Sequence, residues 1–341
     1  MTGRERLLRH LAGRPVDSLP CMPITMQFAA GLIGVAYRRY AFDHRVLVEA
    51  QARVAGAFGF DHVSAISDPA REASDLGAAI VAEEDTPPAM DGAAPLLAAK
   101  DALRSLEGKP GVCGPRMTDR LEAIAGLRRT CPDLLVEGWI EGPCAEGADL
   151  RGINNLMTDF MDDPRFVRDL FEFVTQFEIS FARMQADAGA DLIGIGDAAA
   201  SLVGPRVYRE FVLEYEKRMV EAIHDMGALV RLHICGNTRR ILGELGATGA
   251  DIVDLDYPAP IADARRLMGS AQVLLGNLDP VSVLRDSGPD AVRDAVAACH
   301  RDAGARYIVG PGCEVPRDTP HANLRELVRY AREHKPDGSA A

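Results

Sequence analysis

Short apolar runs rich in Val, Ile and Leu alternate with longer amphipathic stretches along almost the whole chain, and few folds accommodate this alternation. Eight runs are predicted to be strands, at residues 21–25, 62–67, 134–140, 191–196, 228–234, 251–256, 272–277 and 306–310. Helical periodicity occupies many of the segments between them, including 44–58, 118–130, 164–188, 206–226, 289–304 and 320–334. Strands separated by helices pair in parallel through right-handed crossovers. Eight such strands predict a (β/α)8 barrel.

The other segments predict additions to one barrel and not a second domain. The N-terminal stretch "MTGRERLLRHLAGRPVD" has the pattern of a short amphipathic helix, which predicts an N-terminal helical extension. Residues 68–117 are irregular and rich in Ala, Pro and Gly, so we expect an insertion after the second strand, with a small extra strand at 78–84. The length of 341 residues is normal for a single α/β barrel, so the sequence predicts one domain over residues 1–341.

Composition excludes several classes of protein. Hydrophobic residues make up 47% of the chain and charged residues 26%, which allows a large core and argues against wholesale disorder. A net charge of −12 does not favour partners such as nucleic acid or anionic membranes. The N-terminus lacks the apolar segment of a signal peptide, and no apolar run reaches the roughly 18 residues of a membrane helix, so we expect a cytoplasmic protein. The odd count of 7 cysteines favours free thiols or metal ligands over disulfides.

Polar residues follow nearly every predicted strand. In a barrel of this kind the functional site lies on the loops after the carboxyl ends of the strands. The residues at these ends are Gln27, Asp68, Glu141, Asp197, His233, Cys235, Asp256, Asn277, Asp279, Cys313 and Glu314. Polar residues also begin wherever a strand leaves a core, so each position taken alone has a structural explanation of equal weight.

His233, Cys235 and Cys313 form the pattern most typical of a metal site. Residues two apart in an extended strand point the same way, so His233 and Cys235 can reach one ion. Cys313 follows the last strand and leaves the barrel at the same end, and Gly310 and Gly312 before it would let the backbone bend sharply. An imidazole and two thiolates suit Zn²⁺ and suit Mg²⁺ or Ca²⁺ poorly. The alternative is a core histidine beside buried cysteines that act as small hydrophobic residues.

The sequence resembles the uroporphyrinogen decarboxylase superfamily along nearly its whole length. The matching stretches occur in family order: "GRPVDSLPCMP" (13–23), "EGPCAEGADL" (141–150), "GADLIGIGDAAASLVGP" (189–205), "HICGNTRRIL" (233–242), "LLGNLDPVSVL" (274–284) and "YIVGPGCEVPRDTPHANL" (307–324). Within the superfamily, "HICGN" followed by "GPGCEVP" is similar to the zinc-dependent corrinoid methyltransferases, which include the methylcobamide:coenzyme M methyltransferases. The resemblance implies a barrel with a zinc ion held by His233, Cys235 and Cys313.

Decarboxylation of uroporphyrinogen is the alternative within the same superfamily. The decarboxylases carry an "RQAGRY"-like stretch near the N-terminus, whose arginines hold the carboxylates of the substrate. The corresponding region here reads "PITMQFAAGLIG" (23–34) and contains no arginine. Arg38 and Arg39 follow nearby, but not in that pattern. A substrate with eight carboxylates needs several arginine partners, so this departure disfavours the decarboxylase reaction.

The resemblance therefore implies transfer of a methyl group between a corrinoid and a thiol, with methylcobamide as co-substrate. Zinc would make the thiol reactive by removing its proton. The chain lacks a D-x-H-x-x-G cobalamin motif, so we expect the corrinoid to arrive on a separate protein or free in solution. Two alternatives keep the barrel: methyl or alkyl transfer from an O- or N-methyl donor or an epoxide, and a non-catalytic cobamide-binding accessory protein.

Three further residues are candidate catalytic groups. Asp256 follows the strand next to the one bearing His233, and could be a displaceable fourth zinc ligand or a carboxylate that accepts the His233 N–H. Asp197 and Asn277 could contact the substrate, although helix capping and loop hydrogen bonds explain them equally well. Glu141 lies in the turn sequence "EGP", where a structural role competes with a functional one.

Overall fold

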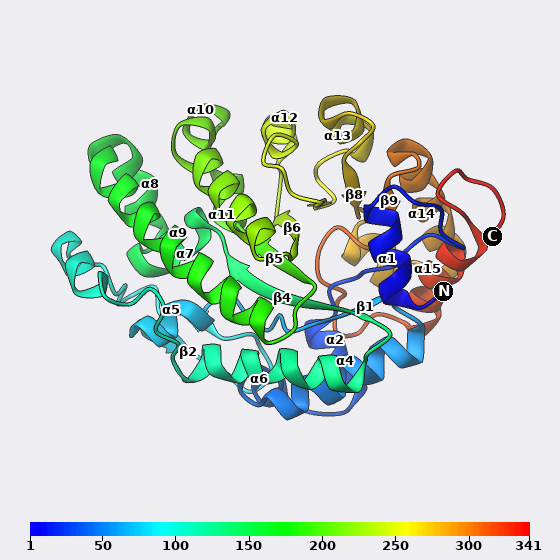
Figure 1. The fold of residues 1–341 in the computed structure, drawn as a ribbon, viewed down its shortest axis with the longest axis horizontal. Coiled ribbons are helices and arrows are strands. Elements are labelled where there is room, and N and C mark those ends of the chain that lie inside the picture. The colour runs from blue at the N-terminus through cyan, green and yellow to red at the C-terminus, as the bar shows by residue number, and fades with distance from the viewer.

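Seven parallel strands follow one another in chain order around a curled central sheet in the computed structural model, which describes residues 1–341 (Figure 1). The order is β1-β4-β5-β6-β7-β8-β9. The strands are β1 (His62–Ser64), β4 (Leu135–Glu141), β5 (Leu192–Gly196), β6 (Leu229–Ile234), β7 (Ile252–Leu255), β8 (Val273–Leu275) and β9 (Tyr307–Ile308). Each is flanked in the chain by helices, as the alternation of apolar runs and amphipathic stretches predicts.

The predicted first strand, 21–25, is reduced to a single bridge that takes the eighth position. Cys21 pairs in parallel with Val309, just after β9, and the carbonyl of Cys21 accepts a hydrogen bond of 3.1 Å from the Asp61 amide, just before β1. Pro20 and Pro23 have no amide hydrogen to donate, which prevents a longer ladder here. The (β/α)8 prediction is therefore confirmed, with one position held by a bridge.

The helices surround the sheet, and the predicted ones are present (Figure 1). Those that match the sequence prediction are α4 (His44–Phe58), α6 (Pro115–Thr130), α9 (Pro164–Asp187), α11 (Leu213–Asp225), α14 (Pro289–Ala303) and α15 (His321–Glu333). The predicted helix 206–226 is interrupted, because α10 (Pro205–Val207) passes into the π-helical turn η3 (Tyr208–Val212) before α11. The others are α2 (Met26–Leu32), α3 (Tyr37–Phe42), α7 (Pro143–Arg151), α8 (Ile153–Asp162), α12 (Leu242–Leu245) and α13 (Ile261–Met268), with short turns η2 (Ala198–Leu202), η4 (Arg239–Ile241) and η5 (Pro280–Arg285).

The insertion predicted after the second strand is present between β1 and β4. It consists of α5 (Arg71–Leu76), a two-stranded antiparallel hairpin and the 3-10 turn η1 (Lys100–Leu106). The hairpin pairs β2 (Ile80–Val81) with β3 (Ala89–Met90), so the extra strand expected at 78–84 is confirmed in a shorter form. None of the helices in the structure combines the length and the apolar character that a membrane crossing requires.

The N-terminal helix closes one end of the barrel. Leu7 of α1 (Gly3–Leu11) is fully buried in a cluster with Leu135, Leu192, Ile252 and Val273, which are the first residues of four strands. Burial of these side chains removes apolar surface from water at the amino ends of the strands. The carboxyl ends are thereby the end at which a site can open to solvent.

An ionic group lies inside the barrel beneath this open end. Arg231 of β6 is 1% exposed and bonds to two buried carboxylates. Its Nη1 donates to Glu137 Oε1 over 3.1 Å and its Nη2 to Asp254 Oδ2 over 2.7 Å. A buried guanidinium between two carboxylates is compensated only while both partners remain. Arg231 therefore links β4, β6 and β7 and fixes the position of Asp254.

Candidate metal centre and pocket

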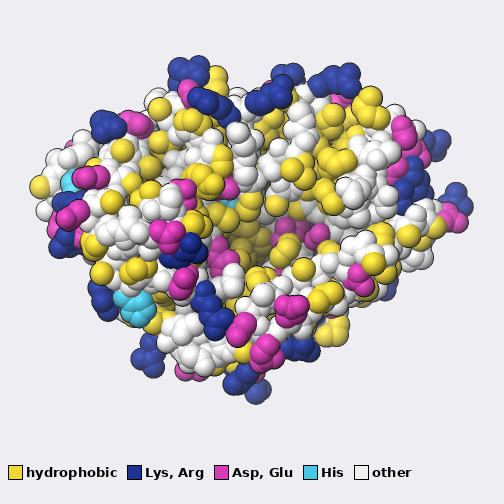
Figure 2. Space-filling model, turned by 180° about the vertical axis from the view of Figure 1, so that it is seen from behind, with side chains coloured by type: hydrophobic (Ala, Val, Ile, Leu, Met, Phe, Trp, Pro, Cys, Tyr) yellow, Lys and Arg dark blue, Asp and Glu magenta, His cyan; other side chains and the backbone are white.

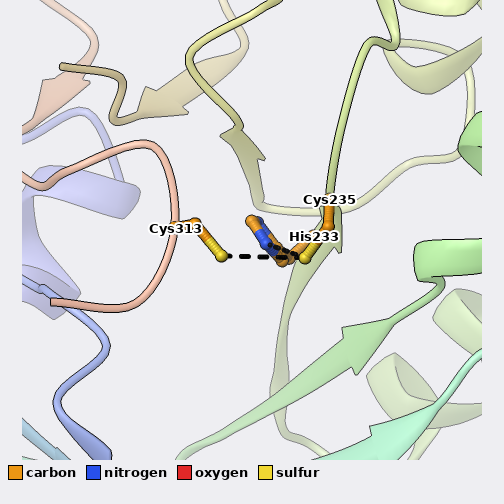
Figure 3. A group of neighbouring side chains, drawn as sticks. All are labelled: His233, Cys235 and Cys313. Atoms are coloured by element: carbon orange, nitrogen blue, oxygen red, sulfur yellow. Dashed lines mark hydrogen bonds between the residues drawn. The ribbon is translucent and has the colours of Figure 1, made fainter. Parts of the chain in front are cut away.

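His233, Cys235 and Cys313 meet at the open end of the barrel (Figure 3). His233 belongs to β6, Cys235 follows the end of that strand, and Cys313 lies in the loop after β9. His233 Nε2 lies 3.0 Å from Cys235 Sγ, and the two sulfur atoms lie 3.7 Å apart. The three donor atoms all lie within 4.8 Å of one another. The structure thus brings together the three residues that the sequence nominates.

Close backbone approach places Cys313 in this group. A Cβ atom at Gly312 would collide with the backbone nitrogen of Tyr257, so only glycine lets the Cys313 loop lie against the loop after β7. The Gly312 amide donates a hydrogen bond of 2.9 Å to the Leu278 carbonyl, which holds the loop there. The role of the glycine is therefore close contact, and not the sharp bend that the sequence suggests, because Gly312 does not have a positive φ.

The donor atoms fit a tetrahedral zinc ion. Two sulfurs at about 2.3 Å from one ion in tetrahedral geometry are about 3.8 Å apart, and the two thiols already have nearly this spacing. The hydrogen bond from the Cys235 thiol, together with the His233 ring, lowers the pKa of Cys313 to about 4, so one sulfur is ready to act as a thiolate ligand. One nitrogen and two sulfurs form a donor set that suits zinc and leaves a fourth position exchangeable.

Asp254 orients the histidine, and sequence reasoning missed it. His233 Nδ1 lies 2.9 Å from Asp254 Oδ2, and the two residues are partners in the β6–β7 register. Since a carboxylate only accepts hydrogen bonds, Nδ1 carries the proton and Nε2 presents its lone pair to the cysteines. Although burial opposes ionisation, the Arg231 charge and the hydrogen bonds from His233 and Arg231 hold the pKa of Asp254 below its usual value. The sequence did contain a signal, because Asp254 lies two residues before Asp256 and therefore on the same face of the predicted strand.

One of the two roles predicted for Asp256 is wrong, because Asp256 does not accept the His233 N–H. Its Oδ2 accepts a hydrogen bond of 2.6 Å from the Gly236 amide, and its Oδ1 one of 2.7 Å from the Tyr257 amide. The carboxylate that accepts the His233 N–H is Asp254, because Asp254 and not Asp256 lies opposite His233 in the sheet. Asp256 therefore fixes the loop after Cys235, and its role as a displaceable fourth ligand stays a prediction.

Asp197 and Asn277 are placed in structural hydrogen bonds. Asp197 is fully buried, and its Oδ1 accepts a hydrogen bond of 2.6 Å from the Ala145 amide in the first turn of α7. Burial raises the pKa of Asp197 to about 7. The Nδ2 of Asn277 donates to the carbonyls of Asp256 and Ala259 over 3.1 and 2.5 Å. Helix capping and loop bonding, the alternatives that the sequence leaves open, account for both side chains, and neither lines the pocket described next.

A pocket of about 180 Å³ opens beside the three donor residues. Its walls include the apolar side chains of Ile24, Met26, Ile66 and Trp139 and the carboxyl groups of Asp68, Glu141 and Glu314. The face turned away from the viewer in Figure 1 is hollowed at its centre, and Figure 2 shows hydrophobic side chains in the hollow with acidic and basic ones around it. No Lys or Arg lines the pocket. The site is therefore an apolar recess with carboxyl groups around a set of soft metal ligands.

Trp139 is the other wall residue that sequence reasoning missed. It is the single tryptophan of the chain, and its indole lies against Gly194 of β5, where a Cβ atom would collide with the ring. Its Nε1 donates a hydrogen bond of 3.2 Å to Glu141 Oε1. The glycines in "LIGIG" were the available signal, because glycine within a strand often marks close approach of a bulky group.

The remaining nominated residues divide between the pocket and its support. Asp68 lines the pocket, but its two oxygens bond Arg116 over 2.9 and 2.6 Å. Glu314 accepts a hydrogen bond of 2.6 Å from the amide of Gln27, whose contribution is thus from its backbone. Asp279 caps η5 through the amides of Val281 and Ser282. Strand-end reasoning therefore selects the correct face but does not separate wall residues from caps.

Comparisons with known proteins identify relatives of this chain. The family model for uroporphyrinogen decarboxylase (URO-D) matches residues 2–334. The methylcobamide:CoM methyltransferase MtbA of Methanosarcina acetivorans is 30% identical over 98% of this chain and 98% of its own length. A uroporphyrinogen decarboxylase of Nocardia farcinica is 31% identical over 62% of this chain and 59% of its own length. A solved methyltransferase structure from Methanosarcina mazei superposes with a TM-score of 0.84 at 21% identity, over 98% of this chain and 99% of that one.

The family match spans nearly the whole chain, and the solved methyltransferase structure shares its fold. The chain belongs to the uroporphyrinogen decarboxylase (URO-D) family.

Proposed function

We propose that this protein is a zinc-dependent methyltransferase that moves a methyl group between a corrinoid and a thiol. The observation that carries the proposal is the group of one nitrogen and two sulfur donors at the open end of the barrel, beside an apolar pocket. Similarity to methylcobamide:CoM methyltransferases over 98% of the chain supports the same reaction class.

Zinc held by His233, Cys235 and Cys313 would supply a position at which a thiol loses its proton and stays nucleophilic. The residues of the chain prepare this position. Asp254 holds the Nδ1 proton of His233, so that Nε2 points to the two sulfurs. Asp256 fixes the Gly236 amide and with it the loop that carries Cys235. The apolar walls exclude water from the reacting sulfur, which strengthens its nucleophilicity relative to a solvated thiolate.

The reaction balances without an oxidant or a general base. The thiol would release its proton to solvent on binding, and its sulfur would then attack the methyl carbon to form a carbon–sulfur bond. The carbon–cobalt bond breaks, and its electron pair stays on cobalt, which is reduced from cobalt(III) to cobalt(I). The main contribution of the barrel to the reaction rate would be to position the two reactants.

A separate carrier of the corrinoid would dock at the open end of the barrel. Three large apolar side chains project there from the segments after three strands: Leu202, Tyr257 and Val281 are 65%, 50% and 44% exposed. Exposed apolar groups near a site are typical of surfaces that contact another molecule. A free cobamide, with its broad macrocycle, would use the same surface.

Decarboxylation of uroporphyrinogen is disfavoured by the pocket. A substrate with eight carboxylates needs cationic partners, and the pocket offers carboxyl groups and no Lys or Arg. Transfer from an O- or N-methyl donor or an epoxide would use the same metal centre and differs in the substrate alone.

Metal analysis and a cobalt spectrum test the function together. The purified protein should contain one zinc per chain, and zinc-loaded protein mixed with methylcobalamin and a small thiol should convert the methylcobalamin spectrum to that of cobalt(I). Loss of conversion after chelation, with recovery on adding zinc, is the expected control. Zinc-loaded protein that leaves methylcobalamin unchanged with every thiol would refute the proposal, and efficient turnover of uroporphyrinogen would assign the chain to the other reaction.

The two aspartates near the metal centre should differ in their effect on zinc affinity. Asp254→Asn keeps the size of the side chain but removes the charge that orients His233, and we expect zinc affinity to fall roughly ten- to a hundredfold. Asp256→Ala should keep zinc, because three protein ligands remain. The thiol substrate should bind to this variant at least as tightly as to the wild type, because no carboxylate has to leave the metal. Competition with a chromophoric chelator measures both variants. Equal losses would show that Asp256 contributes to the metal site as much as Asp254.

Asp197→Asn should change the pH dependence of stability. The pKa of Asp197 rises from 3.8 to about 7 on folding because of burial. The folded chain therefore holds this proton more strongly than the unfolded chain, so stability falls as pH rises from about 4 to about 7. Asparagine can still accept from the Ala145 amide but does not titrate, so the variant should lose this part of the dependence. Urea unfolding at a series of pH values measures it, and an unchanged profile would contradict the assignment.

A further inference from the structure

The pocket beside the metal ligands continues into a second chamber of about 570 Å³. The two share Pro69, Glu141, Ala198 and Cys235 as wall residues. The second chamber adds apolar side chains, among them Ala145, Ala148 and Ile153, and the carboxyl groups of Asp91 and Asp149. Neither chamber is lined by a Lys or an Arg. A substrate whose sulfur reaches the metal ligands would therefore extend its other end along carboxyl groups and apolar walls.

Glu141 and Asp149 belong to a larger group of buried carboxyl groups behind the chamber wall. Glu72, Glu146 and Glu178 are fully buried. Both carboxyl oxygens of Glu146 and of Glu178 lack a hydrogen-bond partner, as does Asp149 Oδ2. The guanidinium in this group, Arg71, contacts Glu72 and lines neither chamber. Carboxyl groups outnumber the cation, so the wall is short of positive charge.

This surplus of acid distinguishes between ligands by charge. Burial and the neighbouring carboxyl groups raise the pKa of Asp149 to about 7 and that of Glu141 well above its usual range. A cation that enters the chamber stabilises the ionised form of these carboxyl groups and so lowers their pKa. An anion finds no counter-ion, and burial of an unpaired charge is costly. The Trp139 ring adds a π face that attracts cations as well.

We propose that these chambers select a thiol that carries a positively charged amino group, with Glu141 and Asp149 as its partners, over a thiol that carries a sulfonate. The inference rests on the proposed function, because it names the substrate class of the same site. It separates this chain from the relatives named for coenzyme M, which is a two-carbon thiol ending in a sulfonate. The chambers disfavour the sulfonate because they offer it no cationic partner, and they favour the amine because two carboxylates can pair with it.

Binding can be measured without metal or cobalt, because the single tryptophan lines the pocket. Metal-free protein is titrated with three S-methyl thioethers of one two-carbon skeleton, which end in an amine, a hydroxyl or a sulfonate, and Trp139 fluorescence is followed. We expect the amine to bind at least about tenfold more tightly than the sulfonate, which corresponds to about 1.4 kcal/mol. Equal affinities, the reverse order, or no response to the amine would overturn the proposal.

Two isosteric variants identify the partners. Glu141→Gln and Asp149→Asn should each lower the ratio of amine to hydroxyl affinity, by about tenfold for a lost charge partner. Asp162→Asn, which removes an exposed carboxylate of α8 outside both chambers, is the matched control and should leave the ratio unchanged. An unchanged ratio in both chamber variants would exclude these carboxyl groups as the partners and overturn the proposal.

Turnover separates this inference from the function on which it rests. Zinc-loaded protein with methylcobalamin is given 2-aminoethanethiol, 2-mercaptoethanol or 2-mercaptoethanesulfonate, and the rate at limiting thiol is compared. The fastest reaction with the aminothiol supports the inference. The fastest reaction with the sulfonate overturns it and leaves the methyltransferase function in place. No reaction with any thiol refutes the methyltransferase function, and the order of the fluorescence affinities then decides the charge preference by itself.

Discussion

Cys313→Ser should release most of the zinc and abolish methyl transfer, while the barrel stays folded. A hydroxyl group is a much poorer zinc ligand than a thiolate, and one nitrogen and one sulfur would remain. The loss of affinity should exceed the roughly ten- to a hundredfold typical of a lost outer hydrogen bond. Elemental analysis gives the zinc content, the cobalt spectrum gives the activity, and circular dichroism reports the fold. Cys235→Ser should behave in the same way.

Cys131→Ser is the matched control for both variants. Cys131 is a half-buried thiol at the end of α6 and lies outside the metal centre. Its replacement should leave zinc content and rate at the wild-type level. A Cys313→Ser protein that keeps a full complement of zinc would remove Cys313 from the ligand set.

Arg231→Met should strongly destabilise the barrel. Methionine fills much of the same space but leaves Glu137 and Asp254 buried without their common partner. Removal of one member of a buried ionic group costs about 3–5 kcal/mol of unfolding free energy. Urea or guanidinium unfolding measures the change, and any folded fraction should also bind zinc less tightly, because Asp254 loses the charge that holds it.

Arg209→Met is the control for this variant. Arg209 pairs with Glu244 over 2.9 Å, but its side chain is 58% exposed. Exposed ion pairs contribute about 0–1 kcal/mol, so this variant should unfold close to the wild-type midpoint. If Arg231→Met costs no more than Arg209→Met, the ionic group inside the barrel does not stabilise the fold.

The barrel was predictable because it depends on patterns that are local in sequence. Runs such as "DLIGIG" (191–196) and "ALVRLHI" (228–234) differ clearly from the amphipathic helices between them. The strand predicted at 21–25 was too long, because Pro20 before it and Pro23 in its middle have no amide hydrogen to donate to a ladder. The pair His233 and Cys235 was predictable for the same local reason, since residues two apart share a face of a strand.

The partners of the metal centre depend on contacts between distant segments. Asp254 is set by the register of β6 and β7, which the sequence does not specify. Asp197 caps α7 from a position 52 residues away in sequence. In the sequence alone, a polar residue at a strand end looks the same whether it caps a distant helix or lines a pocket. Trp139 reaches the pocket wall because Gly194, on the next strand, leaves room for its ring. Each of these roles comes from tertiary packing.

Arg231, which joins the sheet interior to Asp254, has a consequence for how the metal is acquired. The conformational entropy of His233 and Asp254 is lost when the barrel folds, since both side chains are fixed by buried bonds, of His233 to Asp254 and of Asp254 to Arg231. Zinc would therefore meet a preorganised receptor, in contrast to small zinc-dependent domains in which metal binding drives folding. A chelator should empty the site without unfolding the protein, so metal loading can serve as a reversible on–off control of the reaction.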